Sequence, residues 1–299
     1  MDRKGFIGAS EVSAILGLNP FCTALNLWAL KTGKLEKPEE ATEGQEWGKR
    51  LERVVSHKFA EKHNVKLIAY KKRFVHPTMS FFSCELDNII ASTTEIVEIK
   101  TVNAFDWKKW DKPDELPAYV IVQVMAQMGL TGRTKAWVAV LCGGQKYIEK
   151  EVSFDAELWS KIEQAVKDFW ENFVIANTPP LATSDDKETL LEIFPKELDA
   201  EMLQNYQDME NDIARRQELA MHIDAMKEEK EGIENKLRQI IGEHTGIITQ
   251  KYTVKNKLQR TAPKIDFDAM KIDNIYGKYA TDNFTRVLRI TLNKGERDV

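Results

Sequence analysis

The chain has 299 residues, 42% of them hydrophobic, and a net charge of −4 at pH 7. This length allows one large domain or two modest ones, and the slight negative charge argues against a protein that coats nucleic acid non-specifically. No apolar run approaches the roughly 20 residues of a membrane span, and residues 1–8 lack the apolar segment of a secretory signal. Cys22, Cys84 and Cys142 form no CxxC pair, which favours reduced thiols in a cytoplasmic protein over disulfides or a zinc site.

Residues 1–180 show a mixture of helical and strand patterns. Helices are expected at residues 10–16, 23–32, 43–63, 117–130 and 154–177. Strands are expected at residues 66–70, 73–76, 81–84, 88–91, 95–102, 135–141 and 146–152. This mixture predicts an α/β fold in which helices flank a central mixed β-sheet.

The charges divide the chain into three zones. Residues 181–244 carry 8 Lys/Arg against 17 Asp/Glu, residues 245–299 carry 11 against 6, and residues 1–180 carry 24 of each sign. The sequence Thr-Pro-Pro at residues 178–180 is a stiff breaker that a helix does not cross. We therefore expect a domain at residues 1–180, a helical, coiled-coil-like segment at 181–244 and a small basic β-containing element at 245–299.

Two patterns distinguish the C-terminal zones. In residues 188–243, apolar residues recur in steps of 3 and 4, which predicts a long helix or a helical hairpin. This segment is expected either to pack on the body of the protein or to self-associate. Strands are expected at residues 247–254 and 285–292, with a basic, partly irregular stretch between them. The basic side chains of this zone either contact DNA or a partner protein, or form a solvated face. They are Lys251, Lys255, Lys257, Arg260 and Lys264.

The most informative stretch contains Asp87 and, eleven residues later, Glu98-Ile99-Lys100. Glu98 and Lys100 are two residues apart in an expected strand, so their side chains leave the same face. The tripeptide alone is weak support for a site, because an exposed strand shows Glu-Ile-Lys by chance. The argument rests on the whole set of residues.

Hydrolysis of a phosphodiester needs a divalent ion to polarise the phosphate and activate water. Mg²⁺ prefers a few hard oxygen ligands, which Asp87, Glu98 and the backbone carbonyl of Ile99 would provide; Mn²⁺ is the alternative ion. Lys100 would orient the attacking water and stabilise negative charge, and burial near a metal would lower its pKa.

Two helices offer further candidates. Glu52 is the expected third acid and metal ligand, and Gly48, one turn earlier, leaves room for close approach. Tyr119 and Gln123 lie four residues apart on one helix face and would orient water or phosphate. The competing interpretation is a solvated helix charge for Glu52 and core or boundary packing for the other two.

Several motifs in order resemble the YqaJ-type viral recombinase family, relatives of lambda exonuclease in the PD-(D/E)XK nuclease superfamily. The resemblance covers roughly residues 3–175 and rests on the opening RKGFIGASEV at 3–12, LGLNPF at 16–21, KTG at 31–33, WGKRLE at 47–52, Asp87, Glu98-Ile99-Lys100, and Tyr119 with Gln123. One departure concerns the aspartate turn, where Glu85-Leu86-Asp87-Asn88 stands for the family's Ser-Pro-Asp-Gly and adds a second acid.

The resemblance implies a restriction-endonuclease-like core and a Mg²⁺-dependent 5′→3′ exonuclease on linear double-stranded DNA. Such an enzyme leaves 3′ single-stranded tails for a single-strand annealing protein, in phage-type homologous recombination. It further implies that Arg3 and Ser10 bind the 5′ phosphate, with Ser10 also placed to cap the following helix. A ring-shaped trimer, and a phage or prophage gene expressed in the cytoplasm of a bacterial host, follow from the same resemblance.

Three alternatives stay open. One is an endonuclease or single-strand nuclease of the same superfamily with different polarity. Another is a non-catalytic module that binds DNA ends or a recombinase, although a decayed site would be expected to lose at least one of Asp87, Glu98 and Lys100. The last is a structural protein built around residues 199–241, which leaves the N-terminal zone unexplained.

Overall fold

The computed structural model describes residues 4–36, 40–70, 72–112, 115–194, 207–265 and 280–292, with residues 207, 262–265 and 280–292 described by backbone alone. The chain divides into two units, residues 1–200 and residues 201–299.

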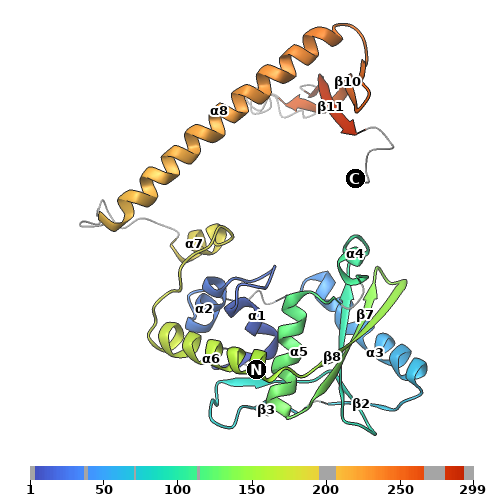
Figure 1. Cartoon of the computed structure of the whole chain (residues 1–299), viewed down its shortest axis with the longest axis vertical. Helices are drawn as coiled ribbons and strands as arrows, with labels where there is room; N and C mark the ends of the chain where they lie inside the picture. The colour runs from blue at the N-terminus through green and yellow to red at the C-terminus, as the bar shows by residue number, and fades with distance from the viewer. Residues whose placement is uncertain are drawn as a thin grey trace. The chain divides into compact units, whose positions relative to one another are not determined.

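A five-stranded sheet forms the centre of the first unit (Figure 1). Its strands, in spatial order, are β2 (Leu67–Ala69), β5 (Asn88–Ile90), β6 (Ile96–Val102), β7 (Lys135–Cys142) and β8 (Lys146–Ser153). β6 and β7 are parallel, and the other neighbours are antiparallel. The sheet is therefore mixed, as the sequence predicted.

A smaller sheet carries the N-terminus. Its order is β1 (Ile7–Gly8), β4 (Phe82–Cys84) and β3 (Phe74–Val75), with β1 parallel to β4. The sequence analysis predicted no strand at residues 7–8. This strand forms because Ile7 is fully buried and pairs with Phe82, a partner 75 positions away in the chain.

Helices cover the central sheet. They are η1 (Ala9–Glu11) leading into α1 (Val12–Ile15), α2 (Ala24–Thr32), α3 (Glu43–His63), η2 (Ala104–Asp106) leading into α4 (Trp107–Trp110), α5 (Ala118–Thr131), α6 (Ala156–Phe169) with the π-helical turn η3 (Trp170–Ile175), and α7 (Lys187–Ile193). The Thr23 hydroxyl caps α2 by accepting from Asn26 N, and Gly33 ends that helix at φ 73°. Each long helix predicted in this zone is therefore present.

The two faces of β6 bury different side chains. Val97 and Ile99 pack with Val55 and Phe59 of α3, whereas Ile96 packs into the larger core that includes α1, α2, α5 and α6. Because side chains alternate along a strand, Glu98 and Lys100 leave the same face as Ile96, toward α5. This alternation sets the location of the candidate site.

The first unit extends beyond the predicted boundary at residue 180. Asp186 is fully buried; its carboxylate accepts hydrogen bonds from the Thr23 hydroxyl and from Thr183 N at 2.7 Å. The amide of Asn26 donates to the Thr189 hydroxyl at 3.0 Å. α7 is therefore packed against α2. The acidic composition of residues 181–194 did not predict this contact.

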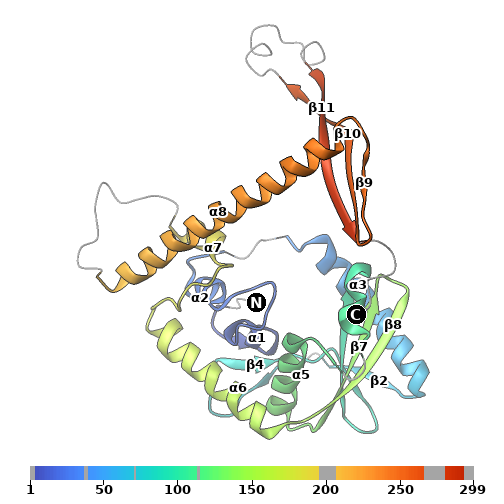
Figure 2. The ribbon, with the colours of Figure 1, turned by 45° about the horizontal axis from the view of Figure 1, so that its top comes forward.

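The second unit contains one long helix and a three-stranded antiparallel sheet (Figure 2). Its elements are η4 (Gln207–Met209), α8 (Glu210–Ile241), β9 (Gly246–Ile248), β10 (Tyr252–Ile265) and β11 (Ala280–Leu292). α8 is a single helix of 32 residues rather than a hairpin, and its apolar seam, including Ile223, Met226 and Ile233, is exposed. The predicted strand at 247–254 is two strands separated by a turn, and the stretch expected to be irregular forms β10.

Candidate active site

Glu98 is the centre of a hydrogen-bonded cluster between β6 and α5. Its side chain is almost fully buried, and its Oε1 accepts from Gln123 Nε2 at 2.6 Å and from Lys100 Nζ at 2.7 Å. Its Oε2 accepts from Gln127 Nε2 at 2.7 Å, and Lys100 Nζ also donates to Gln123 Oε1 at 2.9 Å. These bonds fix the carboxylate and the ammonium in one geometry, which a functional site needs.

Asp87 joins this cluster from the segment between β4 and β5. Its Oδ2 accepts a hydrogen bond from Ile99 N at 2.8 Å. Burial, and then repulsion from Glu98, raise the pKa of the Asp87 carboxyl to about 8, against the lowering effect of the Ile99 hydrogen bond. Glu52 adds a smaller repulsion that raises the same pKa. Three acids are thus close enough to act on one another.

The backbone at Ile99 is also oriented toward Asp87. The pairing of β5 with β6 ends at Asn88 and Val97, so β6 after Val97 has no backbone pairing with β5. The N–H and C=O of one strand residue point to the same side of the strand. Because Ile99 N–H points at Asp87, the Ile99 carbonyl faces that side too, where a shared cation would lie.

The donor set fits a hard divalent cation, although it is incomplete. Asp87, Glu98 and the Ile99 carbonyl supply oxygens, and mutual repulsion of the carboxylates favours a positive charge between them. Among the described residues, however, no three His, Cys, Asp or Glu side chains are gathered closely enough to form a metal site. Glu52 as the third carboxylate of this site stays a prediction: its charge raises the pKa of Asp87, and Val55 and Phe59 of the same helix pack on the opposite face of β6.

The pKa of Lys100 departs from its ordinary value in the direction opposite to that expected. Burial alone would lower the pKa of the ammonium, but the charge of Glu98 and its hydrogen bond raise it above the usual range. Lys100 Nζ is paired with Glu98 Oε1 at 2.7 Å, which favours the charged ammonium. Its predicted role as a donor that stabilises negative charge fits this state, whereas a role as a neutral base does not.

Tyr119 does not join the hydrogen-bonded cluster. It lines a second, open cavity of about 840 Å³ together with Lys100 and Phe21, and its ring packs edge-on against Phe21 at 6.2 Å between centroids. The structure therefore places Gln123 at the acids and Tyr119 beside them.

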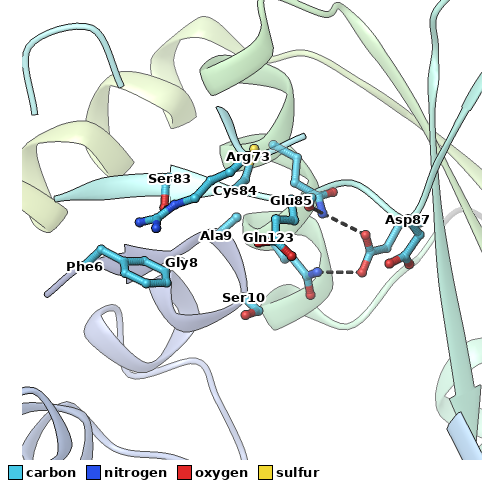
Figure 3. Close-up of a pocket in the computed structure, with 12 residues that line it drawn as sticks. Phe6, Gly8, Ala9, Ser10, Arg73, Ser83, Cys84, Glu85, Asp87 and Gln123 are labelled. Carbon is cyan, nitrogen blue, oxygen red and sulfur yellow. Dashed lines mark hydrogen bonds between the residues drawn. The ribbon is translucent and has the colours of Figure 1, made fainter. Parts of the chain in front are cut away.

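The opening motif borders the same acids. A smaller cavity of about 210 Å³ is lined by Ser10, Asp87, Glu98 and Gln123, among others (Figure 3). Ser10 is not a helix cap: Gly8 precedes η1, and Gly8 N donates to Glu11 Oε2 at 2.8 Å. Arg3 lies outside the described residues.

Sequence reasoning missed two residues of this site. Gln127 donates to Glu98 and to the Glu85 carbonyl, and within the described part of the chain its buried Oε1 has no hydrogen-bond partner. Its signal was present, because Gln123 and Gln127 are four apart on an otherwise apolar helix. Arg73 also lines the smaller cavity, and nothing in its local sequence marked it.

The fold of the first unit is an α/β fold similar to that of alkaline exonuclease structures. The alkaline exonuclease LHK-Exo from Laribacter hongkongensis superposes with a TM-score of 0.50 at 20% identity, over 59% of this chain and 91% of that one. The structure of LHK-Exo in complex with dAMP gives a TM-score of 0.50 at 19% identity, with the same coverage. At these identities the similarity establishes the fold alone.

Residues 1–134 match the family model of the YqaJ-like viral recombinase domain, which supports the resemblance over the part of the chain that carries the cluster. The uncharacterized protein YqaJ of Bacillus subtilis (strain 168) is 35% identical over 182 residues. That alignment covers 60% of this chain and 57% of the relative, so the chain spans less than two thirds of the relative's length. No helix in the described ranges combines the length and apolar character needed to span a membrane.

Proposed function

We propose that this chain is a metal-dependent 5′→3′ exonuclease that acts on the ends of linear double-stranded DNA, with Mg²⁺ as the resident ion and Mn²⁺ as the alternative. The observation that carries the proposal is the buried junction of Asp87, Glu98 and Lys100, fixed by Gln123 and Gln127. The raised pKa of the Asp87 carboxyl, beside a paired ammonium in a cavity, favours a functional site. Its place in a YqaJ-like viral recombinase domain supports a nuclease.

Each residue has a distinct role in the proposed reaction. Asp87, Glu98 and the Ile99 carbonyl would hold the ion, which would polarise the scissile phosphate and activate water. Lys100 donates hydrogen bonds toward the attacking water and the developing negative charge. Gln123 and Gln127 hold the Glu98 carboxylate in position, and Gln123 also orients Lys100 through its Oε1.

The shape of the site favours an exonuclease over an endonuclease. The cavity that contains Asp87 and Glu98 is only about 210 Å³, while the cavity on the Lys100 side is about 840 Å³ and open. The smaller cavity would take the terminal nucleotide, and the remainder of the strand would lie in the larger cavity. An endonuclease needs room for DNA on both sides of the cut.

One assay tests the proposal. Linear duplex labelled at either the 5′ or the 3′ end is incubated with the protein and Mg²⁺, with EDTA in a parallel reaction. We expect early release of the 5′ label as mononucleotide and persistence of the 3′ label. Internal fragments would indicate the endonuclease alternative, and binding without any cleavage would indicate the non-catalytic module.

The wider biological setting extends the same proposal. An exonuclease of this polarity leaves 3′ single-stranded tails, which suit a single-strand annealing protein as partner in homologous recombination. A homo-oligomer in the form of a trimeric ring, and a phage or prophage gene acting in the bacterial cytoplasm, rest on the family resemblance. Mass measurement of the protein with and without duplex DNA tests the oligomer.

The pH dependence of Mg²⁺ binding follows from the raised pKa of Asp87. Below a pH of about 8 the metal-free carboxyl carries a proton that a bound cation must displace, so the affinity for Mg²⁺ should fall about tenfold per pH unit from 8 toward 6. Calorimetric titration in buffers of different ionisation enthalpy measures the released proton. Asp87→Asn serves as the control and should release none; an affinity independent of pH in the unaltered protein would contradict the prediction.

The basic C-terminal strand is expected to contact the DNA backbone. Lys255 and Lys257 are exposed on β10, two residues apart and so on one face of the strand. Phosphate contacts make affinity depend steeply on salt, with a slope near −0.9 per contact. Deleting residues 245–299 should therefore flatten the log–log slope of DNA affinity against salt, as measured by fluorescence anisotropy, and an unchanged slope would assign this face to a partner or to solvent.

A further inference from the structure

The long helix α8 has an apolar seam that its own unit leaves exposed. From Leu219 onward, seven positions at alternating steps of 4 and 3 span three heptads, and six of them are apolar. Five of the apolar side chains are exposed, from Leu219 at 43% to Ile240 at 68%, and Leu237 is half-buried. The seven residues of the seam are Leu219, Ile223, Met226, Lys230, Ile233, Leu237 and Ile240.

Within the second unit, α8 is supported only near its C-terminal end. Ile241 is fully buried, and the three strands of this unit lie beside that end of the helix while the rest extends away from them (Figure 2). Helices in proteins gain most of their stability by packing an apolar face. An exposed seam of three heptads therefore indicates a partner helix, since this length and spacing are those of a coiled coil.

Charged residues flank the seam, and each flank carries one charge of either sign. Heptad positions are assigned with Lys230 at a and Ile233 at d, the two central residues of the part that follows Ile223. The flanking charges are then Lys227 and Glu234 at the e positions, and Glu229 and Lys236 at the g positions.

These charges disfavour a parallel pair of α8 helices. Equivalent positions lie side by side in a parallel pair, so Lys230 would face Lys230 of the second copy inside the seam. Each g residue also lies near the e residue five positions later in the other helix, which would place Glu229 beside Glu234. Both contacts join like charges.

An antiparallel pair brings opposite charges together instead. When Lys230 packs against Ile233 of the second copy, its ammonium extends past that side chain to water. A shift by one heptad would place Lys227 beside Lys227 and Glu229 beside Glu229, so the charges select one register. In that register the flanking contacts are Lys227 with Glu234 and Glu229 with Lys236, each occurring twice by symmetry.

We propose that α8 is a dimerisation helix that pairs antiparallel with α8 of a second copy of this chain, in the register that places Lys230 against Ile233. The partner is identified by charge, because the pattern of α8 is complementary to itself in this one arrangement. The inference is independent of the proposed function, since no residue of α8 belongs to the candidate active site.

Two methionines of α8 provide a matched test of the seam. Met226 is at a d position and Met221 is at an outward f position, and both are exposed in the single chain, at 61% and 72%. Sedimentation velocity of the full chain, from low to high micromolar concentration, measures association. Met226→Glu should weaken association by more than about 100-fold, because a carboxylate would be buried in an apolar seam. Met221→Glu should change it by less than about twofold.

Charge reversal tests the direction of the pair. In the antiparallel pair, Glu229→Lys creates two repulsive contacts with Lys236 and should weaken association about tenfold, whereas in a parallel pair it would create attractive contacts with Glu234. Lys236→Glu should weaken association to a similar extent. The described ion pairs within this part of α8 involve other side chains, so neither variant disturbs them. Mixing the two variants restores both contacts, and the mixture should associate as the unaltered protein does.

A disulfide gives an independent measurement of direction. Ile223 and Ile240 face each other across the proposed pair, but in a parallel pair they lie roughly 25 Å apart along the axis, at 1.5 Å per residue. A mixture of Ile223→Cys and Ile240→Cys chains should form a disulfide-linked dimer under mild oxidation, and neither variant alone should do so. The unaltered chain controls for its own free cysteines.

The results that would overturn this inference are distinct from those that bear on the nuclease proposal. A chain that stays monomeric at every concentration, or an assembly that Met226→Glu leaves unchanged, would show that a second α8 does not cover the seam. Stronger association of Glu229→Lys, or cross-links in either single-variant sample, would overturn the antiparallel arrangement. If circular dichroism shows that Met226→Glu fails to fold, the two charge variants carry the test, because mixing them restores association without altering the seam.

Discussion

Asp87→Asn is expected to reduce the rate of DNA cleavage on the order of 10³-fold while DNA binding persists. The substitution keeps the shape of the side chain and removes the negative charge that would hold the ion, and stabilisation of transition-state charge by a metal is worth several kcal/mol. Glu98→Ala and Asp87→Ala should abolish cleavage in the same way. Single-turnover rates on end-labelled duplex, with affinity measured in parallel, check this result.

Asp87→Asn should also make the metal-free protein more stable at high pH. The pKa of the Asp87 carboxyl rises from its ordinary value of 3.8 to about 8 in the folded protein. An acid whose pKa is raised by folding destabilises the fold as the pH rises from about 4 toward 8, because its ionisation then favours the unfolded chain. Removing the ionisable group should therefore raise the melting temperature at pH 9 in EDTA and leave it nearly unchanged at pH 4.

A matched aspartate controls for loss of charge elsewhere. Asp111 is exposed and pairs with Lys146 at 2.6 Å on the surface. Asp111→Asn should alter neither cleavage nor the melting temperature by a measurable amount, since exposed ion pairs contribute little. If Asp87→Asn cleaved at the normal rate, the metal site would have to be placed elsewhere in the chain.

Lys100→Met is expected to reduce the cleavage rate by about 10²-fold or more, as for the loss of a donor that stabilises developing charge. The substitution frees Glu98 Oε1 from its ion pair while Gln123 Nε2 still holds that oxygen. The affinity for Mg²⁺ should therefore be unchanged or higher, and the loss should appear in kcat. Titration of activity against Mg²⁺ concentration separates the two effects.

Lys135 provides the control for this variant. It lies on β7 of the same sheet and pairs with Glu151 at 2.7 Å, away from the acids. Lys135→Met should cleave at a normal rate. A normal rate in Lys100→Met would remove Lys100 from the mechanism, whereas a lower rate that excess Mg²⁺ restores would show that Lys100 acts on metal binding instead.

The sequence by itself determined the strand that carries the site. Alternation along residues 96–102 placed Glu98 and Lys100 on one face of a strand. The order of short strands and helices predicted a mixed sheet flanked by helices. These features follow from local periodicity, which depends only on neighbouring residues. Asp87 was selected by chemistry rather than by periodicity, because a Mg²⁺ site needs a second hard oxygen ligand close to Glu98.

Tertiary structure alone decided which groups meet at that face. Gln127 and Arg73 reach the cavity because α5 and the segment before β3 pack there. Val55 and Phe59 of α3 are buried on the opposite face of β6. The pKa of Lys100 depends on whether burial or Glu98 dominates, and that balance is set by a distance of 2.7 Å. Such distances arise from packing between segments far apart in the chain, so no local pattern in the sequence specifies them.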